Sequence, residues 1–161
     1  GADLMTGGTG DDVSYIDSTG DRMREYADGG HDIAWSSVTY TLSSEVDELW
    51  LSGVATINAI GNELDNVIAG NSGNNSLTGG LGADVFTFLA ANGQDIVTDF
   101  NATQGDTLAF AASGVDVTIS QAGNDALIDF GDGNTVTVLN TSATDTGFLS
   151  AIFYSIYSEF A

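Results

Sequence analysis

Aspartate or asparagine recurs at fixed intervals in two separate blocks of this chain of 161 residues. In both blocks the intervals are nine, nine and eleven residues, and a further interval of eleven leads to Asp106. The residues at these positions are Asp3, Asp12, Asp21 and Asp32 in the first block, and Asn66, Asn75, Asp84 and Asp95 in the second. A period this short predicts a stack of small repeated units.

Glycines precede the periodic acids in a regular way. The nine-residue units are GGTGDDVSY from Gly7, GNELDNVIA from Gly61, GNSGNNSLT from Gly70 and GGLGADVFT from Gly79. Glycine permits backbone angles that are closed to residues with a Cβ, so the chain can turn tightly and direct its carbonyls inward. The three residues that follow each acid are too few for a helix and fit one short strand. Two units would therefore complete one coil of a parallel β-solenoid.

In such a solenoid alternate loops lie on the same edge, one above the other. We expect loop 7–12 to stack on loop 27–32, loop 61–66 on loop 79–84, and loop 70–75 on loop 90–95, with Asp3 and Asp21 forming a further pair. Carboxylates and converging carbonyls supply hard oxygen ligands, and calcium takes six to eight of these. The spacing therefore predicts Ca²⁺ ions between stacked loops.

Composition narrows the choice of partner. Asp and Glu total 23 against two Lys or Arg, which gives a formal net charge of −21. Nucleic acid and anionic membranes are poor partners because their binding depends on basic residues, whereas divalent cations are natural ones. Cysteine is absent, so disulfides and thiolate metal sites are excluded. The sequence contains no apolar run long enough to span a membrane, so we expect no membrane insertion. It also contains no convincing set of catalytic residues, so we expect any catalytic domain to lie upstream of Gly1.

Along its length the chain divides into four parts that we expect to form one structural unit. Residues 1–35 and 61–106 are the repeat blocks, and residues 36–60 are a degenerate coil without ions. Residues 107–161 form a capping region, in which segments 116–120, 126–130 and 135–139 alternate in polarity and predict an antiparallel meander. Residues 146–160 fit a short helix capped by Asp145, or alternatively a terminal strand.

The four units, the run from Ser36 to Phe86 and the segment GQDIVTDFNATQGDTL from Gly93 resemble the RTX family. This resemblance implies an all-β, right-handed parallel β-roll that binds several Ca²⁺ ions. It further implies a bacterial protein exported by a type I ABC transporter, which folds on calcium binding outside the cell and is extracellular or on the cell surface. Residues 157–161 are similar to the C-terminal secretion signal of some such proteins.

The resemblance also implies the ligands of each ion. One loop offers the carbonyls of its first and third places and its sixth-place carboxylate, and the loop one full coil later offers the carbonyls of its second and fourth places and its own sixth-place carboxylate. The first site would use Gly7, Thr9 and Asp12 with Asp28, Gly30 and Asp32. The second would use Gly61, Glu63 and Asn66 with Gly80, Gly82 and Asp84, and the third Gly70, Ser72 and Asn75 with Ala91, Gly93 and Asp95. Asp99 and Asp106 would close a further site with Asp84. Asn66 and Asn75 each remove a charge, so their sites are either weak or held empty by asparagine hydrogen bonds.

An alternative function is calcium-dependent binding of a polysaccharide or cell surface. Trp35, Trp50 and Tyr40 would favour it if they were exposed in a row, although aromatic residues on strands more often belong to the core. His31 stands at the variable fifth place of a loop, where we expect exposure to solvent rather than catalysis.

Overall fold

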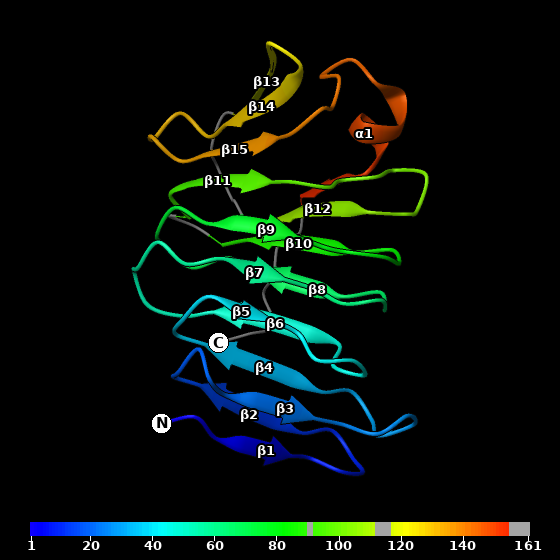
Figure 1. Cartoon of the computed structure of the whole chain (residues 1–161). Helices are drawn as coiled ribbons and strands as arrows, with labels where there is room; N and C mark the ends of the chain where they lie inside the picture. The colour runs from blue at the N-terminus through cyan, green and yellow to red at the C-terminus, as the bar shows by residue number, and fades with distance from the viewer. Residues whose placement is uncertain (90–91, 112–116, 155–161) are drawn as a thin grey trace.

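The computed structural model describes residues 1–89, 92–111 and 117–154, and these form a parallel β-solenoid (Figure 1). Between residues 33 and 110 successive strands alternate between two sheets, so each full coil there contributes one strand to each sheet. The predicted all-β solenoid is therefore confirmed. The degenerate residues 36–60 are part of it. The strand of residues 48–51 pairs with repeat-block strands on both sides, and residues 59–60 pair with residues 40–41 on one side and residues 77–78 on the other.

The first sheet contains seven strands that all run parallel. In spatial order they are β2 (Val13–Ile16), β4 (Ile33–Ser36), β6 (Glu48–Leu51), β8 (Val67–Ala69), β10 (Val85–Phe88), β12 (Thr107–Phe110) and β16 (Ile152–Tyr154). A separate parallel pair, β1 (Leu4–Thr6) and β3 (Arg22–Arg24), lies at the N-terminal end.

The second sheet begins with five parallel strands and ends in an antiparallel meander. The parallel strands are β5 (Tyr40–Thr41), β7 (Ala59–Ile60), β9 (Ser76–Thr78), β11 (Gln94–Val97) and β15 (Thr135–Val138). The meander adds β14 (Asp125–Asp129) and β13 (Thr118–Ala122). The predicted meander is confirmed, and Asp129 and Asp132 serve as turn residues by accepting the amides of Gly131 and Asn134.

Alternation of inward and outward residues builds a buried apolar core between the sheets. Register aligns Leu49, Ile68, Phe86 and Leu108 in one column, and all four are fully buried. Phe88 and Phe110 stack one coil apart with ring centroids 5.2 Å apart. Each coil thus buries its apolar side chains against the next coil.

The C-terminal segment combines both predicted alternatives. The helix α1 spans only Thr146–Ser150, begins at the expected cap Asp145 and buries Phe148 edge-on against Phe100. The chain then turns into β16, which extends the first sheet beyond β12. Residues 155–160 of the proposed helix and residues 157–161 of the proposed secretion signal lie outside the described residues.

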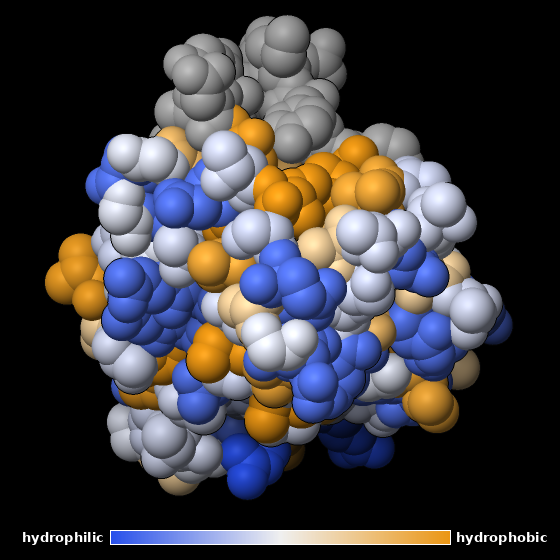
Figure 2. Space-filling view, turned by 90° about the horizontal axis from the view of Figure 1, so that it is seen from above, coloured by the Kyte–Doolittle hydropathy of each residue, from blue (hydrophilic) through white to orange (hydrophobic). Residues whose placement is uncertain are grey.

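Seen from above, the C-terminal end of the solenoid exposes a mixture of hydrophobic and hydrophilic residues (Figure 2). The described part of the chain contains no helix that is long and apolar enough to cross a membrane.

Candidate metal centre

The turns that precede the first-sheet strands stack along one edge of the solenoid, which we call the first edge. Its turns are residues 7–12, 27–32, 43–47, 61–66, 79–84 and 101–106. The last residue of each turn faces its neighbours, which gives the column Asp12, Asp32, Asp47, Asn66, Asp84 and Asp106. Asp47 belongs to this column although it is in no repeat unit. Its position directly before a strand is the sequence signal that could have identified it.

Backbone amides bond to the carboxylates of the next coil. The amide of Asp12 donates to Asp32 Oδ1 at 3.0 Å, and the amide of Asp84 donates to Asp106 Oδ1 at 3.0 Å. On the opposite edge, which we call the second edge, Asp3 donates in the same way to Asp21 at 2.9 Å. This hydrogen bond is the main reason that the pKa of Asp21 is lowered. The loops therefore stack in the pairs that the spacing predicts.

Glycine at the fourth place of a loop lets the coils approach closely. A Cβ on Gly30, Gly82 or Gly93 would lie 2.4, 2.6 or 2.7 Å from the carbonyl oxygen of the fourth residue in the stacked loop. All three glycines have positive φ. The same loop also holds Asp28 at a φ of +64°, in the left-handed region that residues other than glycine seldom adopt.

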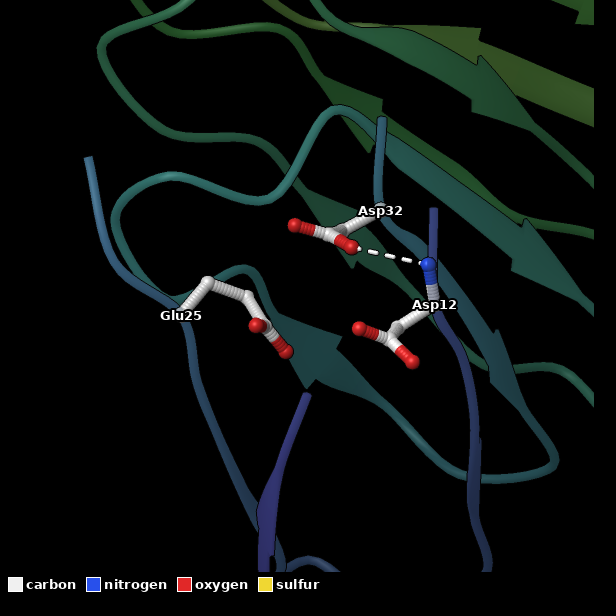
Figure 3. A group of neighbouring side chains, drawn as sticks. All are labelled: Asp12, Glu25 and Asp32. Carbon is white, nitrogen blue, oxygen red and sulfur yellow. Dashed lines mark hydrogen bonds between the residues drawn. The ribbon is translucent and has the colours of Figure 1, made fainter. Parts of the chain in front are cut away.

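Three carboxylates converge at the N-terminal part of the first edge, from Asp12, Glu25 and Asp32 (Figure 3). Each offers an oxygen that lies within 4.8 Å of the others. Glu25 and Asp32 are 8% and 1% exposed. The Oδ2 atoms of Asp12 and Asp32 are buried and have no hydrogen-bond partner among the described residues. Buried, unpartnered carboxylate oxygens are costly unless a cation or donor meets them, so this donor set fits a calcium ion.

Glu25 lies outside the repeat units, and the sequence pattern gave no signal for it. It follows β3, and its two carboxylate oxygens accept the amides of Gly7 and Gly8 at 3.2 and 3.0 Å. Burial raises the pKa of Asp32, and the charges of Glu25 and Asp12 raise it further, against the lowering effect of the Asp12 amide.

A second group on the same edge, Asp84, Asp99 and Asp106, repeats the backbone hydrogen bonds of this arrangement. Within the described residues, however, only Asp12, Glu25 and Asp32 bring three carboxylate oxygens within 4.8 Å of one another. Asp99 accepts the amides of Gly79 and Gly80 at 2.9 Å each, as Glu25 does for Gly7 and Gly8. Burial raises the pKa of Asp84 to about 6, with further contributions from Asp106 and Asp99. Unlike Asp32, Asp106 has its Oδ2 occupied, because the Asn101 amide donates to it at 2.8 Å.

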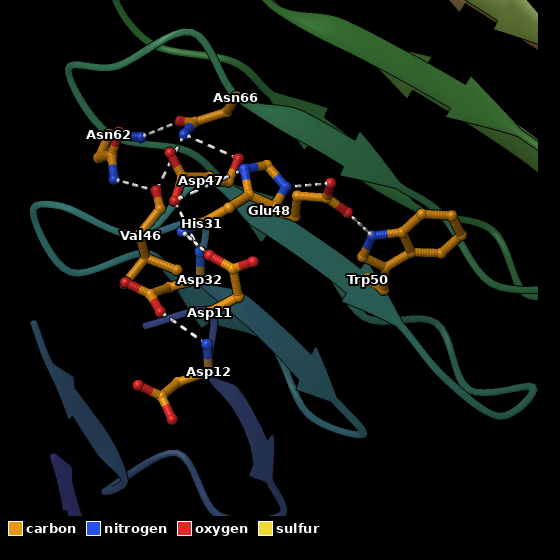
Figure 4. A network of polar contacts seen from close by, with 10 residues as sticks. All are labelled: Asp11, Asp12, His31, Asp32, Val46, Asp47, Glu48, Trp50, Asn62 and Asn66. Carbon is orange, nitrogen blue, oxygen red and sulfur yellow. Dashed lines mark hydrogen bonds and ion pairs between the residues drawn. The ribbon is translucent and has the colours of Figure 1, made fainter. Parts of the chain in front are cut away.

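The loop of Asn66 is closed by side-chain amides (Figure 4). Asn66 Nδ2 donates to the carbonyls of Val46 and Asp47 at 3.1 and 3.2 Å, and Asn62 Nδ2 donates to Ser43 and Val46 at 2.8 Å each. Asn66 Oδ1 accepts the Asn62 amide. The carbonyls that converge here have donors already, so this side of the loop does not fit a cation.

The loop of Asn75 on the second edge has the same construction. Asn71 Nδ2 donates to Ser52 and Ala55, and Asn75 Nδ2 donates to Ile57 at 2.7 Å. Above it, Asp95 accepts the Asn75 amide and the side chain of Asn92. Of the remaining predicted ligands, Gly7, Thr9, Gly61, Glu63, Gly70, Ser72 and Gly80 lie in these stacked loops, whereas Ala91 lies outside the described residues.

The aromatic and histidine residues have structural partners. Tyr40 is buried and accepts the Met23 amide, and Trp35 stacks on Trp50 with centroids 5.4 Å apart. Trp35 and Trp50 therefore each cover part of the other's ring face. His31 is exposed as expected and bonds to Glu48 at 2.6 Å, which raises the pKa of His31 (Figure 4).

Comparison with known proteins agrees with this architecture. The family model of the RTX calcium-binding nonapeptide repeat matches four copies, in residues 1–15 and 60–97. The chain is 34% identical over 154 residues to the endo-1,3-1,4-beta-glycanase ExsH of Rhizobium meliloti, and it spans 33% of the length of that curated relative. The extracellular lipase LipA of Serratia marcescens has a similar fold, with a TM-score of 0.61 at 17% identity over 95% of this chain and 38% of the lipase.

Proposed function

Because this chain is an RTX protein with calcium-binding nonapeptide repeats on a parallel β-solenoid, we propose that it is a secreted module that folds when calcium binds outside the cell. In that role it supports the export and stability of a larger protein. The observation that carries the proposal is the convergence of Asp12, Glu25 and Asp32, with two buried carboxylate oxygens that lack partners in the described chain.

Asp12, Glu25 and Asp32 would hold one ion, together with carbonyls from the two stacked loops around them. Asp84, Asp99 and Asp106 would hold a second, weaker ion, because the Asn101 amide already occupies Asp106 Oδ2. A bound calcium ion supplies positive charge that offsets the repulsion among the carboxylates. Neither Arg22 nor Arg24 forms an ion pair with these acids among the described residues.

Linkage gives calcium control over folding. An ion that binds only the folded chain stabilises it by RT ln(1 + [L]/Kd), about 1.4 kcal/mol per site at tenfold excess over Kd. At the low calcium concentration of the cytosol the carboxylates repel one another, and the glycine loops cost much conformational entropy. The chain would then stay unfolded and could pass through a type I ABC transporter, and it would fold on reaching calcium outside.

Substitution of Glu25 tests the site. We expect Glu25→Gln to weaken calcium binding on the order of tenfold, because ligand charge sets affinity. Glu45→Gln removes the same charge outside the proposed sites and serves as the control. Calorimetric calcium titration and circular dichroism in EGTA are the measurements. A β spectrum that is unchanged by chelation would sink the proposed function, and equal affinities in the two variants would remove Glu25 from the site.

A second candidate function, glycan binding, has one specific observation in its favour. A groove of about 600 Å³ lies on the outer face of the second sheet, lined mostly by amides and hydroxyls such as those of Asn58, Gln94 and Thr137, together with the carboxyl group of Asp95 and the apolar side chains of Ile96 and Leu127. This mixture suits a neutral polysaccharide, which presents hydroxyls and apolar ring faces. The relative ExsH is named as a β-glycanase, which makes mixed-linkage β-glucan the probe of choice.

Affinity electrophoresis tests this second candidate. We expect calcium-loaded protein to be retarded in a gel that contains mixed-linkage β-glucan, and Gln94→Ala to migrate faster than the control Asn124→Ala, whose position is an exposed hairpin turn. Migration of the native chain that is the same with and without glucan would reject glycan binding and leave calcium binding untouched.

A further inference from the structure

The interface between the coil of residues 43–60 and the coil of residues 61–78 differs from the calcium-type interfaces at both of its edges. On the first edge the carbonyls of Ser43, Val46 and Asp47 converge, and on the second edge those of Ser52, Ala55 and Ile57. Converging carbonyls repel one another unless a cation or hydrogen-bond donors lie among them. Here the donors are side-chain amides of the coil above.

The two edges use equivalent residues nine positions apart. Asn62 and Asn71 occupy the second place of their loops, and Asn66 and Asn75 occupy the sixth. In both loops the sixth-place Oδ1 accepts the amide of the second-place residue, at 2.8 and 2.9 Å. Asn66, Asn71 and Asn75 are 1%, 8% and 3% exposed, so these hydrogen bonds are shielded from water.

Aspartate could not replace asparagine here without a cation. A carboxylate at position 66 would place an oxygen against the carbonyls of Val46 and Asp47, where the structure has an N–H donor. Leaving buried carbonyls unsatisfied destabilises the folded state, and an unpaired buried charge destabilises it more. The asparagine side-chain amides therefore satisfy the converging carbonyl oxygens here, a role that a cation would have at Asp12 and Asp32.

The apolar core beneath this interface is complete. Val46, Leu49, Ile68 and Leu77 are all fully buried, and they pack between the two edges. Hydrogen bonds at both edges and a buried apolar core between them satisfy this part of the solenoid without a cation, whereas at Asp12 and Asp32 two buried carboxylate oxygens lack a partner among the described residues.

We propose that the asparagine-closed segment, residues 43–78, is a calcium-independent core from which the solenoid is ordered, and that calcium controls only the coils on either side. The inference rests on the proposed function in one respect, that the flanking coils need calcium. In this inference Asn66 and Asn75, which stand where the repeat has aspartate, replace a bound ion with hydrogen-bond donors.

Hydrogen exchange of the full chain, followed by mass spectrometry, tests the inference. In EGTA we expect β6, β8 and β9 to keep slow exchange while β2 and β12 lose it, and in millimolar Ca²⁺ all five strands exchange slowly. The double variant Asn66→Asp with Asn75→Asp should exchange on the order of a hundredfold faster in β8 and β9 in EGTA, from about tenfold for each lost donor. Asn124→Asp adds a charge at an exposed turn and should change nothing.

The outcomes separate the two proposals. Loss of protection in every strand in EGTA, with recovery in Ca²⁺, overturns the calcium-independent core and leaves the proposed function intact. Slow exchange in every strand in EGTA overturns the proposed function, and with it the distinction between centre and ends. A double variant that keeps native protection in β8 and β9 in EGTA also overturns the inference, because the amides would then carry none of the stability.

Discussion

At the scale of single residues, the solenoid depends on glycine, which has no Cβ, as much as on the aspartate and asparagine side chains of the turns. Neighbouring strands in a sheet lie about 4.8 Å apart, so at certain places of a stacked turn a Cβ would collide with the backbone of the next turn. Gly82 illustrates this requirement, because its φ is +100° and its Cβ would lie 2.6 Å from the Leu64 carbonyl oxygen. The fourth-place glycine thus serves a backbone contact as well as a turn.

Alanine substitution separates these two demands on glycine. Gly82→Ala combines a positive φ with the collision, and we expect it to lower the free energy of unfolding by about 2–4 kcal/mol. Gly53→Ala shares the positive φ, at +81°, but nothing lies within 4 Å of its Cβ, so about 1 kcal/mol is expected. Urea unfolding at saturating calcium measures both. Equal losses in the two variants would show that the close approach to Leu64 costs nothing.

At the scale of elements, the strand order and loop pairing follow from the sequence because one interval fixes them. Intervals of nine and eleven residues bring Asp12 beneath Asp32 and Asn66 beneath Asp84, whatever the intervening side chains are. Glu25 and Asp47 could not be found in this way. Their roles depend on which turn each one faces, and that is set by loop lengths outside the repeat units.

The C-terminal element shows a different limit. The apolar residues from Phe148 onward fit a helical stripe, yet α1 ends at Ser150 and β16 pairs with β12. The open edge of β12 offers backbone hydrogen bonds that a longer helix would leave unmade, and the amide of Leu108 donates to Ala151 at 2.9 Å. The sequence pattern of this segment could not predict the pairing, because the free edge of β12 exists only once the rest of the solenoid has folded.

At the scale of the whole molecule, the net charge of −21 opposes folding, and the buried carboxylates concentrate that opposition inside the structure. In the proposed function, calcium relieves this repulsion at the charged turns, whereas the central coils avoid it by using asparagine in place of aspartate. Protons are a third way to remove the charge. Asp95 and Asp84 are both 1% exposed, and burial is the largest cause that raises the pKa of each from 3.8 to about 6.

The calcium-free chain should therefore become more stable as the pH falls. Because the folded state holds protons on Asp84 and Asp95 more tightly than the unfolded state, their contribution is complete below about pH 4 and is lost as the pH rises through about 6. Thermal unfolding at pH 4.5 and 7.5, of chain first freed of calcium by EGTA at neutral pH and then dialysed into calcium-free buffer, measures the difference. Asp95→Asn, which is uncharged at either pH, should reduce the difference. In excess calcium the trend should reverse, because calcium needs deprotonated carboxylates. A calcium-free chain that melts at the same temperature at both pH values would contradict the buried titration.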